Sequence, residues 1–86
     1  MFDAGSVGRF LVERAEREIE WFDVDACGLS GRVGPIFITR NGTFRFSGRV
    51  ASGRLAISGQ FVAPNKIRGI VTGPRCSHRI SFGARR

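Results

Sequence analysis

The 86-residue sequence has no tyrosine and only one tryptophan, one histidine and two cysteines. A structural zinc site needs four ligands in closely spaced pairs, which His78, Cys27 and Cys76 do not supply. No stretch approaches the roughly 18 consecutive apolar residues of a membrane-spanning helix. We therefore expect no metal, no other cofactor and no transmembrane segment.

The motifs of nucleotide-binding and hydrolytic enzymes are also absent, because there is no P-loop, dinucleotide fingerprint or nucleophile elbow. The glycine-rich segment 28–34 lacks the lysine and the following helix of a phosphate cradle, so we interpret it as a loop. His78 follows Cys76 by two residues, a spacing that could pair a base with a nucleophile. We interpret His78 instead as an exposed residue at the start of a strand. The sequence thus predicts a protein that is not an enzyme.

Acidic residues are confined to one end of the chain. All seven lie within residues 1–25, where only three arginines accompany them and the net charge is −4. Residues 26–86 contain eleven basic residues and no acid. An asymmetry of this size predicts either a surface that faces a polyanion or an acidic segment that folds back onto basic strands. Accordingly, we expect the acidic segment 13–25 to pair laterally with a basic strand of this chain or of a partner.

The length and composition are those of one small globular domain, residues 1–86. Hydrophobic residues make up 42% of the chain and charged residues 24%, a balance typical of folded proteins. Glycine occurs 12 times, which indicates dense turns rather than long helices. A core of this size supplies only a few kcal/mol of net stability, about 3–5, so a covalent cross-link would matter.

The clearest element is a hairpin that turns at Asn41-Gly42, between the apolar runs 35–40 and 43–47. Asn-Gly is typical of the type I′ turn, whose two central residues both have positive φ. A two-residue loop would pair Phe37 with Phe46 and Thr39 with Phe44. These four residues would then share one face of the hairpin, with Arg40, Thr43 and Arg45 on the other.

Three further segments alternate between apolar and polar residues in the manner of strands: 54–61, 66–71 and 78–84. Turn residues separate them, among them Ser52-Gly53 and Pro64-Asn65. Short strands with turns at such intervals are typical of sandwiches and barrels. The sequence therefore predicts an all-β fold, a small antiparallel sandwich or flattened barrel of about six strands.

The N-terminal quarter supports two interpretations. Apolar residues at helical spacing and a helix-forming run, Glu13–Glu18, favour a helix over 7–22, which would make the fold α+β. The apolar run Phe10–Val12, and the alternation of Ile19 and Trp21 with their acidic neighbours, instead favour two strands.

Residues 18–86 resemble small, mostly uncharacterised secreted β-domains of actinobacterial type. The resemblance is carried by Cys27, by the hairpin Pro35–Phe44 with its Asn-Gly turn, by Gly59-Gln60-Phe61, by Cys76, and by Ile80–Arg86 with its Ala-Arg-Arg end. In such domains a β-hairpin precedes the first cysteine, which implies the hairpin rather than the helix over residues 8–26. No established activity accompanies the resemblance.

The two cysteines, Cys27 and Cys76, are expected to form a disulfide, because each flanks a predicted strand next to turn residues in a small glycine-rich domain. The alternative is two buried, reduced thiols in a cytosolic protein. Residues 1–6 lack the features of a signal peptide, so we expect either an intracellular protein or a mature chain. A disulfide would favour an extracellular or cell-surface location.

Basic residues alternate with apolar ones along the expected strands and so fall on the face away from the core. Six basic residues are candidate contacts for an anionic polymer: Arg45, Arg54, Arg68 and Arg79 on the outward face of their strands, and Arg49 and Lys66 at turns. The sequence thus predicts a non-catalytic binding or structural module of a secreted or surface-exposed protein that contacts an envelope polysaccharide or a nucleic acid weakly. The alternative is an intracellular, nucleic-acid-binding small β-barrel. An exposed sheet edge could also pair with a second copy of the chain.

Overall fold

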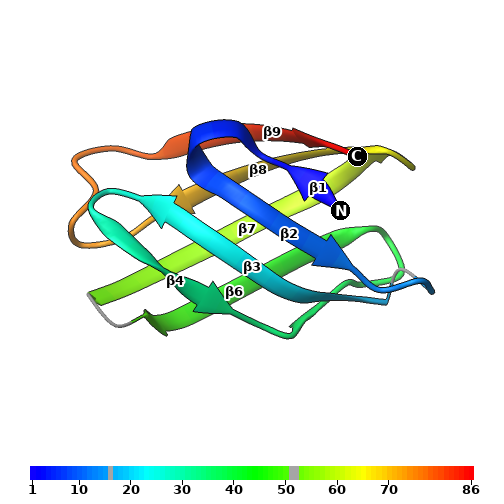
Figure 1. The fold of residues 1–86 in the computed structure, drawn as a ribbon, viewed down its shortest axis with the longest axis horizontal. Coiled ribbons are helices and arrows are strands. Elements are labelled where there is room, and N and C mark those ends of the chain that lie inside the picture. Colours follow the sequence, from blue (N-terminus) through cyan, green and yellow to red (C-terminus); the bar gives the residue numbers. More distant parts are fainter. Residues whose placement is uncertain (16, 51–52) are drawn as a thin grey trace.

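A computed structural model describes residues 1–15, 17–50 and 53–86. Within these ranges the chain forms antiparallel strands and one turn of 3₁₀ helix, η1 (Gly5–Val7). The front layer of Figure 1 contains β1 (Phe2–Asp3), β2 (Gly8–Val12), β3 (Glu18–Ala26) and β4 (Leu29–Val33). The short strand β5 (Ile36–Phe37) leads to the back layer of β6 (Thr43–Val50), β7 (Gly53–Ala63), β8 (Lys66–Thr72) and β9 (Ile80–Arg85).

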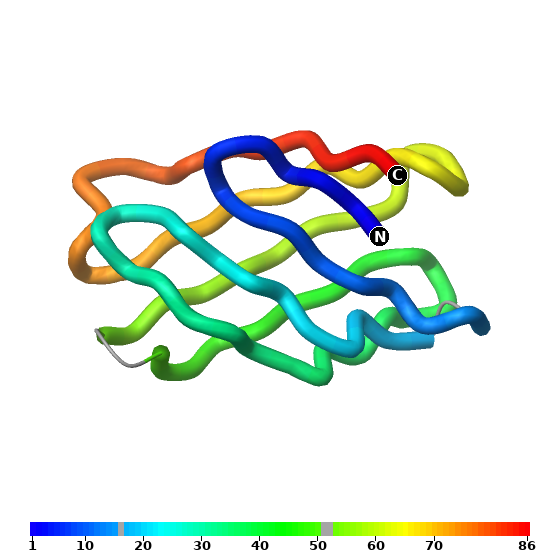
Figure 2. The backbone as a smooth tube through the Cα atoms, in the orientation of Figure 1, coloured from blue at the N-terminus to red at the C-terminus, as the bar shows by residue number. Residues whose placement is uncertain are grey.

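The two layers are parts of one sheet that folds over and nearly closes into a barrel. The strand order is β4-β3-β2-β1-β9-β8-β7-β6, so the terminal strands β1 and β9 join the layers along one edge. Figure 2 shows the two chain ends close together beside this junction. At the opposite edge β5 pairs with β3, and a single bridge links Ile38 to Phe44 of β6. The predicted all-β flattened barrel is confirmed, although the described residues form more strands than the expected six, because β1 and β4 were not foreseen.

The N-terminal segment forms the predicted hairpin, and the alternative of a helix over 7–22 is wrong. Strands β2 and β3 pair with Phe10 opposite Phe22, and the Glu13 amide donates to the Glu18 carbonyl across the turn. A helix over 7–22 would bury only the residues along one side of its surface. The hairpin instead buries Phe10, Ile19 and Phe22 against the opposite layer, a larger gain in apolar contact.

The segment 28–34, predicted to be a loop, contains a strand. Ala26 pairs with Leu29 across a two-residue turn in which Cys27 has φ +58° and Gly28 has φ +73°. These are the two positive φ values of a type I′ turn, whose twist matches that of the flanking strands. The glycines of this segment led to the loop interpretation, although the buried Leu29 and Val33 alternate with the exposed Ser30 and Arg32 as in a strand.

The Asn41-Gly42 hairpin exists, but its predicted type I′ turn and register are wrong. The Thr39 amide donates to the Thr43 carbonyl and the Gly42 amide to the Thr39 carbonyl, so the loop has three residues with only Gly42 at positive φ (+79°). This shifts the pairing by one residue and turns Phe37 outward, where it is 70% exposed. The register is fixed by the chain next to β3. There the Ile38 amide donates a hydrogen bond to the carbonyl of Arg17, the residue before β3, and Ile38 is buried in the core.

The centre of the core is a row of phenylalanines on three adjacent strands. Phe2, Phe10 and Phe22 stand opposite one another on β1, β2 and β3, with ring centroids 5.2 and 4.8 Å apart. Phe61 meets the Phe2 ring edge-on from β7, and Phe82 meets the Phe22 ring edge-on from β9. Each such pair contributes about 0.5–1.5 kcal/mol beyond the burial of its area. The row therefore holds the two layers together.

A second row crosses the back layer and depends on two glycines. Phe44, Gly59, Gly69 and Phe82 follow one another in register across β6, β7, β8 and β9. The Phe44 ring covers Gly59 and the Phe82 ring covers Gly69, in the space that side chains at these positions would take. A Cβ on Gly69 would contact the Phe82 ring and lie 2.8 Å from the Ser58 carbonyl oxygen.

We predict that Gly69→Ala lowers the free energy of unfolding by about 1–3 kcal/mol, because the added methyl group overpacks a site bounded by a ring and by backbone. Urea unfolding followed by tryptophan fluorescence measures the change. Gly83→Ala is the matched control, since its Cβ would meet only the Ile67 carbonyl oxygen, at 3.9 Å. Equal stabilities for the two variants would contradict the packing described.

The predicted disulfide between Cys27 and Cys76 is confirmed, with the two Cα atoms 5.0 Å apart. Cys27 occupies the β3–β4 turn in the front layer, and Cys76 lies in the connection between β8 and β9 in the back layer. The bond therefore joins the layers at the end of the barrel where the cyan and orange loops meet in Figure 1.

Replacing both cysteines, Cys27→Ser with Cys76→Ser, should cost about 4 kcal/mol, the chain-entropy value for a closed loop of this length. Chemical denaturation of the oxidised protein and of the double variant provides the comparison. The oxidised protein should also lose stability to the same extent in dithiothreitol, and the double variant should not respond to it. A loss below about 1 kcal/mol would mean that the phenylalanine rows alone hold the layers together.

Candidate anion-binding face

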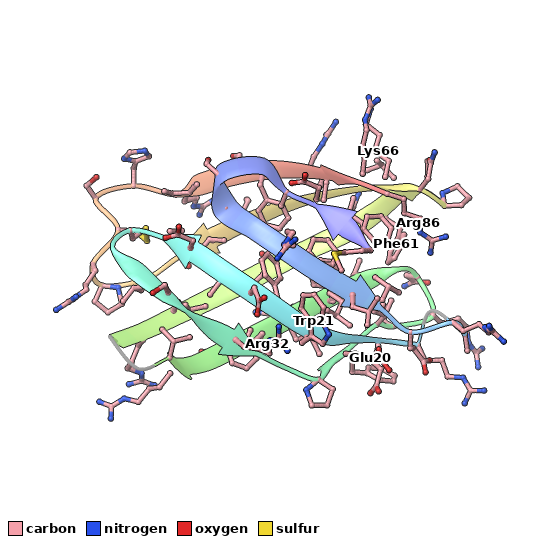
Figure 3. The ribbon with its side chains drawn as sticks, viewed as in Figure 1. Glu20, Trp21, Arg32, Phe61, Lys66 and Arg86 are labelled. Atoms are coloured by element: carbon pink, nitrogen blue, oxygen red, sulfur yellow. A yellow bond between two sulfur atoms is a disulfide. The ribbon has the colours of Figure 1, made fainter. Side chains whose placement is uncertain are left out.

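The six basic residues predicted to contact a polyanion lie on one face, the outer surface of β6–β9. The residues that alternate with them on these strands point into the core. We call this surface the basic face; it carries Arg45, Arg49, Arg54, Lys66, Arg68 and Arg79, all exposed. Arg49 and Lys66, predicted to lie at turns, belong to β6 and β8. Figure 3 shows Lys66 projecting away from the barrel.

Small residues separate the basic side chains on this face. Ser58 pairs with Arg45 on one side and with Ile70 on the other, and Ile70 pairs with Ser81. Two shallow hollows open over this floor, with volumes of about 550 and 420 Å³, and they share Arg45, Ser58 and Ile70. Arg79 lines the larger hollow and Arg68 the smaller. The floor residues were not predicted, although their outward positions follow from the strand alternation.

The charge of the basic face is not neutralised within the described part of the chain. None of its six basic side chains makes an ion pair there, and β6–β9 contain no acidic residue. An acid does approach at one rim, where Asp3 of β1 stands opposite Arg85 of β9 in the sheet register. The described residues bury no charged side chain, so every ionised group lies at the surface.

In the front layer β3 of the acidic segment pairs laterally with β2 and β4, and one ion pair joins it to β4. Asp23 of β3 stands between Arg9 of β2 and Arg32 of β4, and Arg32 donates two hydrogen bonds, of 2.6 and 3.0 Å, to its carboxylate. The same guanidinium lies 4.4 Å from the Trp21 ring centroid, and Figure 3 shows the two side chains together. Through this hydrogen bond Arg32 holds the pKa of Asp23 below its ordinary value of 3.8, and the charges of Arg32 and Arg9 act in the same direction.

The remaining candidates are a Cys76–His78 pair, a metal site and a membrane-spanning helix. The Cys76 sulfur is bonded to Cys27, so Cys76 has no thiolate to pair with His78, whose Nδ1 lies 3.0 Å from the Ser77 hydroxyl. The described residues contain no group of three or more histidine, cysteine or acidic side chains placed to hold a metal ion. They also contain no helix with the length and apolar composition that crossing a bilayer requires.

We predict that Asp23→Asn destabilises the protein slightly at neutral pH and not at all in strong acid. Because the folded-state pKa of Asp23 is depressed, its contribution to stability is present above its unfolded-state pKa and is lost as pH falls through the folded-state value. Melting temperatures of variant and wild type should therefore converge below pH 3.8. Asp25→Asn, on the same strand and outside the ion pair, is the matched control for the loss of one carboxylate. A difference between wild type and Asp23→Asn that persists undiminished below pH 3.8 would contradict the prediction.

Comparisons with known proteins identify no relative. The sequence matches no protein-family model, no curated protein and no solved structure. The function is therefore inferred from the residues of this chain and their geometry.

Proposed function

We propose that this protein is a non-catalytic binding module whose basic face contacts anionic polymers weakly. The observation that carries the proposal is the gathering of six basic side chains on the outside of β6–β9, without an ion pair among the described residues. Five of the six are arginines, whose planar guanidinium suits phosphate, sulfate and carboxylate groups. A rigid sheet holds their backbones at fixed spacing, so little order is lost on binding.

The proposal includes a secreted or surface-exposed location. The Cys27–Cys76 disulfide supports this location, because structural disulfides persist in oxidising compartments. The same bond argues against the alternative of an intracellular nucleic-acid-binding barrel. An interface for single-stranded nucleic acid would also need exposed rings for stacking, and the phenylalanines of β6–β9 are directed into the core.

The experiment is retention on immobilised heparin and duplex DNA as salt rises. For six basic contacts, the logarithm of the binding constant for duplex DNA should fall with the logarithm of salt concentration with a slope no steeper than about −5. Binding should be lost near physiological ionic strength. Arg45→Gln combined with Arg79→Gln should reduce the slope by about 2. The control, Arg14→Gln with Arg17→Gln, removes the same charge from the β2–β3 turn and should change binding much less.

Two outcomes would overturn the proposal. In one, the wild-type protein is not retained on either polymer at low salt. In the other, the turn variant loses as much affinity as the face variant, which would mean that only net charge matters. All four arginines are exposed and outside the core, so their substitution should leave the sheet intact. Circular dichroism of each variant checks this.

A further inference from the structure

Building on the proposed function, we propose that the two hollows of the basic face seat an acidic polysaccharide with widely spaced charges, such as one carboxylate per disaccharide. The ligand would lie across β6–β9, with its sugar rings over the floor and its carboxylates at the arginines. Three features of the face support this assignment over a charge-dense polymer.

The first feature is the floor. At its centre Ile70 is half-buried and stands between Ser58 and Ser81 in the sheet register, so an apolar surface is flanked by two hydroxyl groups. A sugar ring has the same character, because its C–H face is apolar and its edge carries hydroxyls that exchange hydrogen bonds with serine. The hollows, about 550 and 420 Å³, fall within the range of small-molecule sites.

The second feature is the spacing of the arginines around the hollows. Arg45 lies on β6 and Arg79 immediately precedes β9. Three strand spacings therefore separate them, about 14 Å measured across the strands. Arg68 lies on β8, two strand spacings or about 10 Å from β6. Duplex DNA carries a charge about every 1.7 Å of its axis when both strands are counted, a density far above that of arginines separated by about 10 Å or more. A polymer with one carboxylate per disaccharide would place its charges near the arginines instead.

The third feature is the absence of aromatic side chains from the face among the described residues. Phe44 and Phe82 are buried, and Phe46 and Phe61 pack against the core. Single-stranded nucleic acids gain much of their affinity from stacking on exposed rings, which this face does not offer. Ile70 and the small floor residues can contact a sugar face without any ring.

The test uses filling substitutions that leave the charge unchanged. Ser58→Leu and Ser81→Leu each add an apolar side chain to the floor, and their outward positions keep it clear of the core. Binding of a hyaluronan octasaccharide, which has one carboxylate per disaccharide, is measured by calorimetry, and binding of duplex DNA by fluorescence anisotropy. Ala15→Leu, at an exposed position in the β2–β3 turn, is the matched control.

We expect each floor variant to weaken octasaccharide binding by about tenfold or more while its DNA affinity stays within about twofold. For the octasaccharide, the slope of log K against log salt concentration should be no steeper than about −2, because only two or three arginines take part. Ile70→Ser, which removes the apolar floor without adding volume, should weaken octasaccharide binding as well. This variant keeps the test decisive if a leucine substitution lowers the melting temperature.

The results distinguish this inference from the proposed function. If the wild-type protein binds DNA and heparin but not the octasaccharide, or if floor variants weaken both ligands equally, the hollows do not recognise a sugar and only the general polyanion contact stands. If the wild-type protein binds none of the three, the proposed function itself is wrong.

Discussion

The stacking of Phe2, Phe10 and Phe22 is the interaction on which the rest of the structure depends. It aligns β1, β2 and β3, and the edge-on contacts of Phe61 and Phe82 press the opposite layer onto it. Phe2 lies at the start of the chain, so its burial draws β1 against β9 and joins the two layers into one sheet. Without that contact, the terminal strands would leave an open edge on each layer.

The basic face is a consequence of this inward packing. Because the rings of the back layer point into the barrel, the alternating positions outside are left to arginines and small residues. The glycines that lie beneath Phe44 and Phe82 keep β7 and β8 close to those rings. In the front layer Arg32 pairs with Asp23, whereas β6–β9 contain no acidic residue that could pair with the basic face. This uncompensated positive charge favours a polyanion as ligand.

The limits of prediction are clearest around Phe37. Local turn chemistry at Asn41-Gly42 favoured a type I′ turn, but the pairing of β5 with β3 and the hydrogen bond from the Ile38 amide to the Arg17 carbonyl fix a register that needs a three-residue loop. The type I′ turn occurs instead at Cys27-Gly28, where nothing in the local sequence matched the usual Asn-Gly pattern. In both places a contact with a distant strand outweighed the preference of the turn residues. The hollows over Ser58 and Ile70 could not be predicted from the sequence for the same reason, because they depend on which strands lie side by side.

The amino-acid sequence by itself determined the β class, the disulfide pairing, and the outward direction of Arg45, Arg54 and Arg68. The β class and these directions follow from composition and from alternation over a few residues, and two cysteines have only one possible pairing. Over residues 8–26 the local pattern fitted both a helix and strands, so it did not decide between them. The tertiary structure alone decided the register of β5, the closure through β1 and β9, and the juxtaposition of Arg45, Arg68 and Arg79 around one floor. The physical reason is that side-chain alternation specifies a face, whereas neighbours across a sheet are chosen by the packing of the whole core.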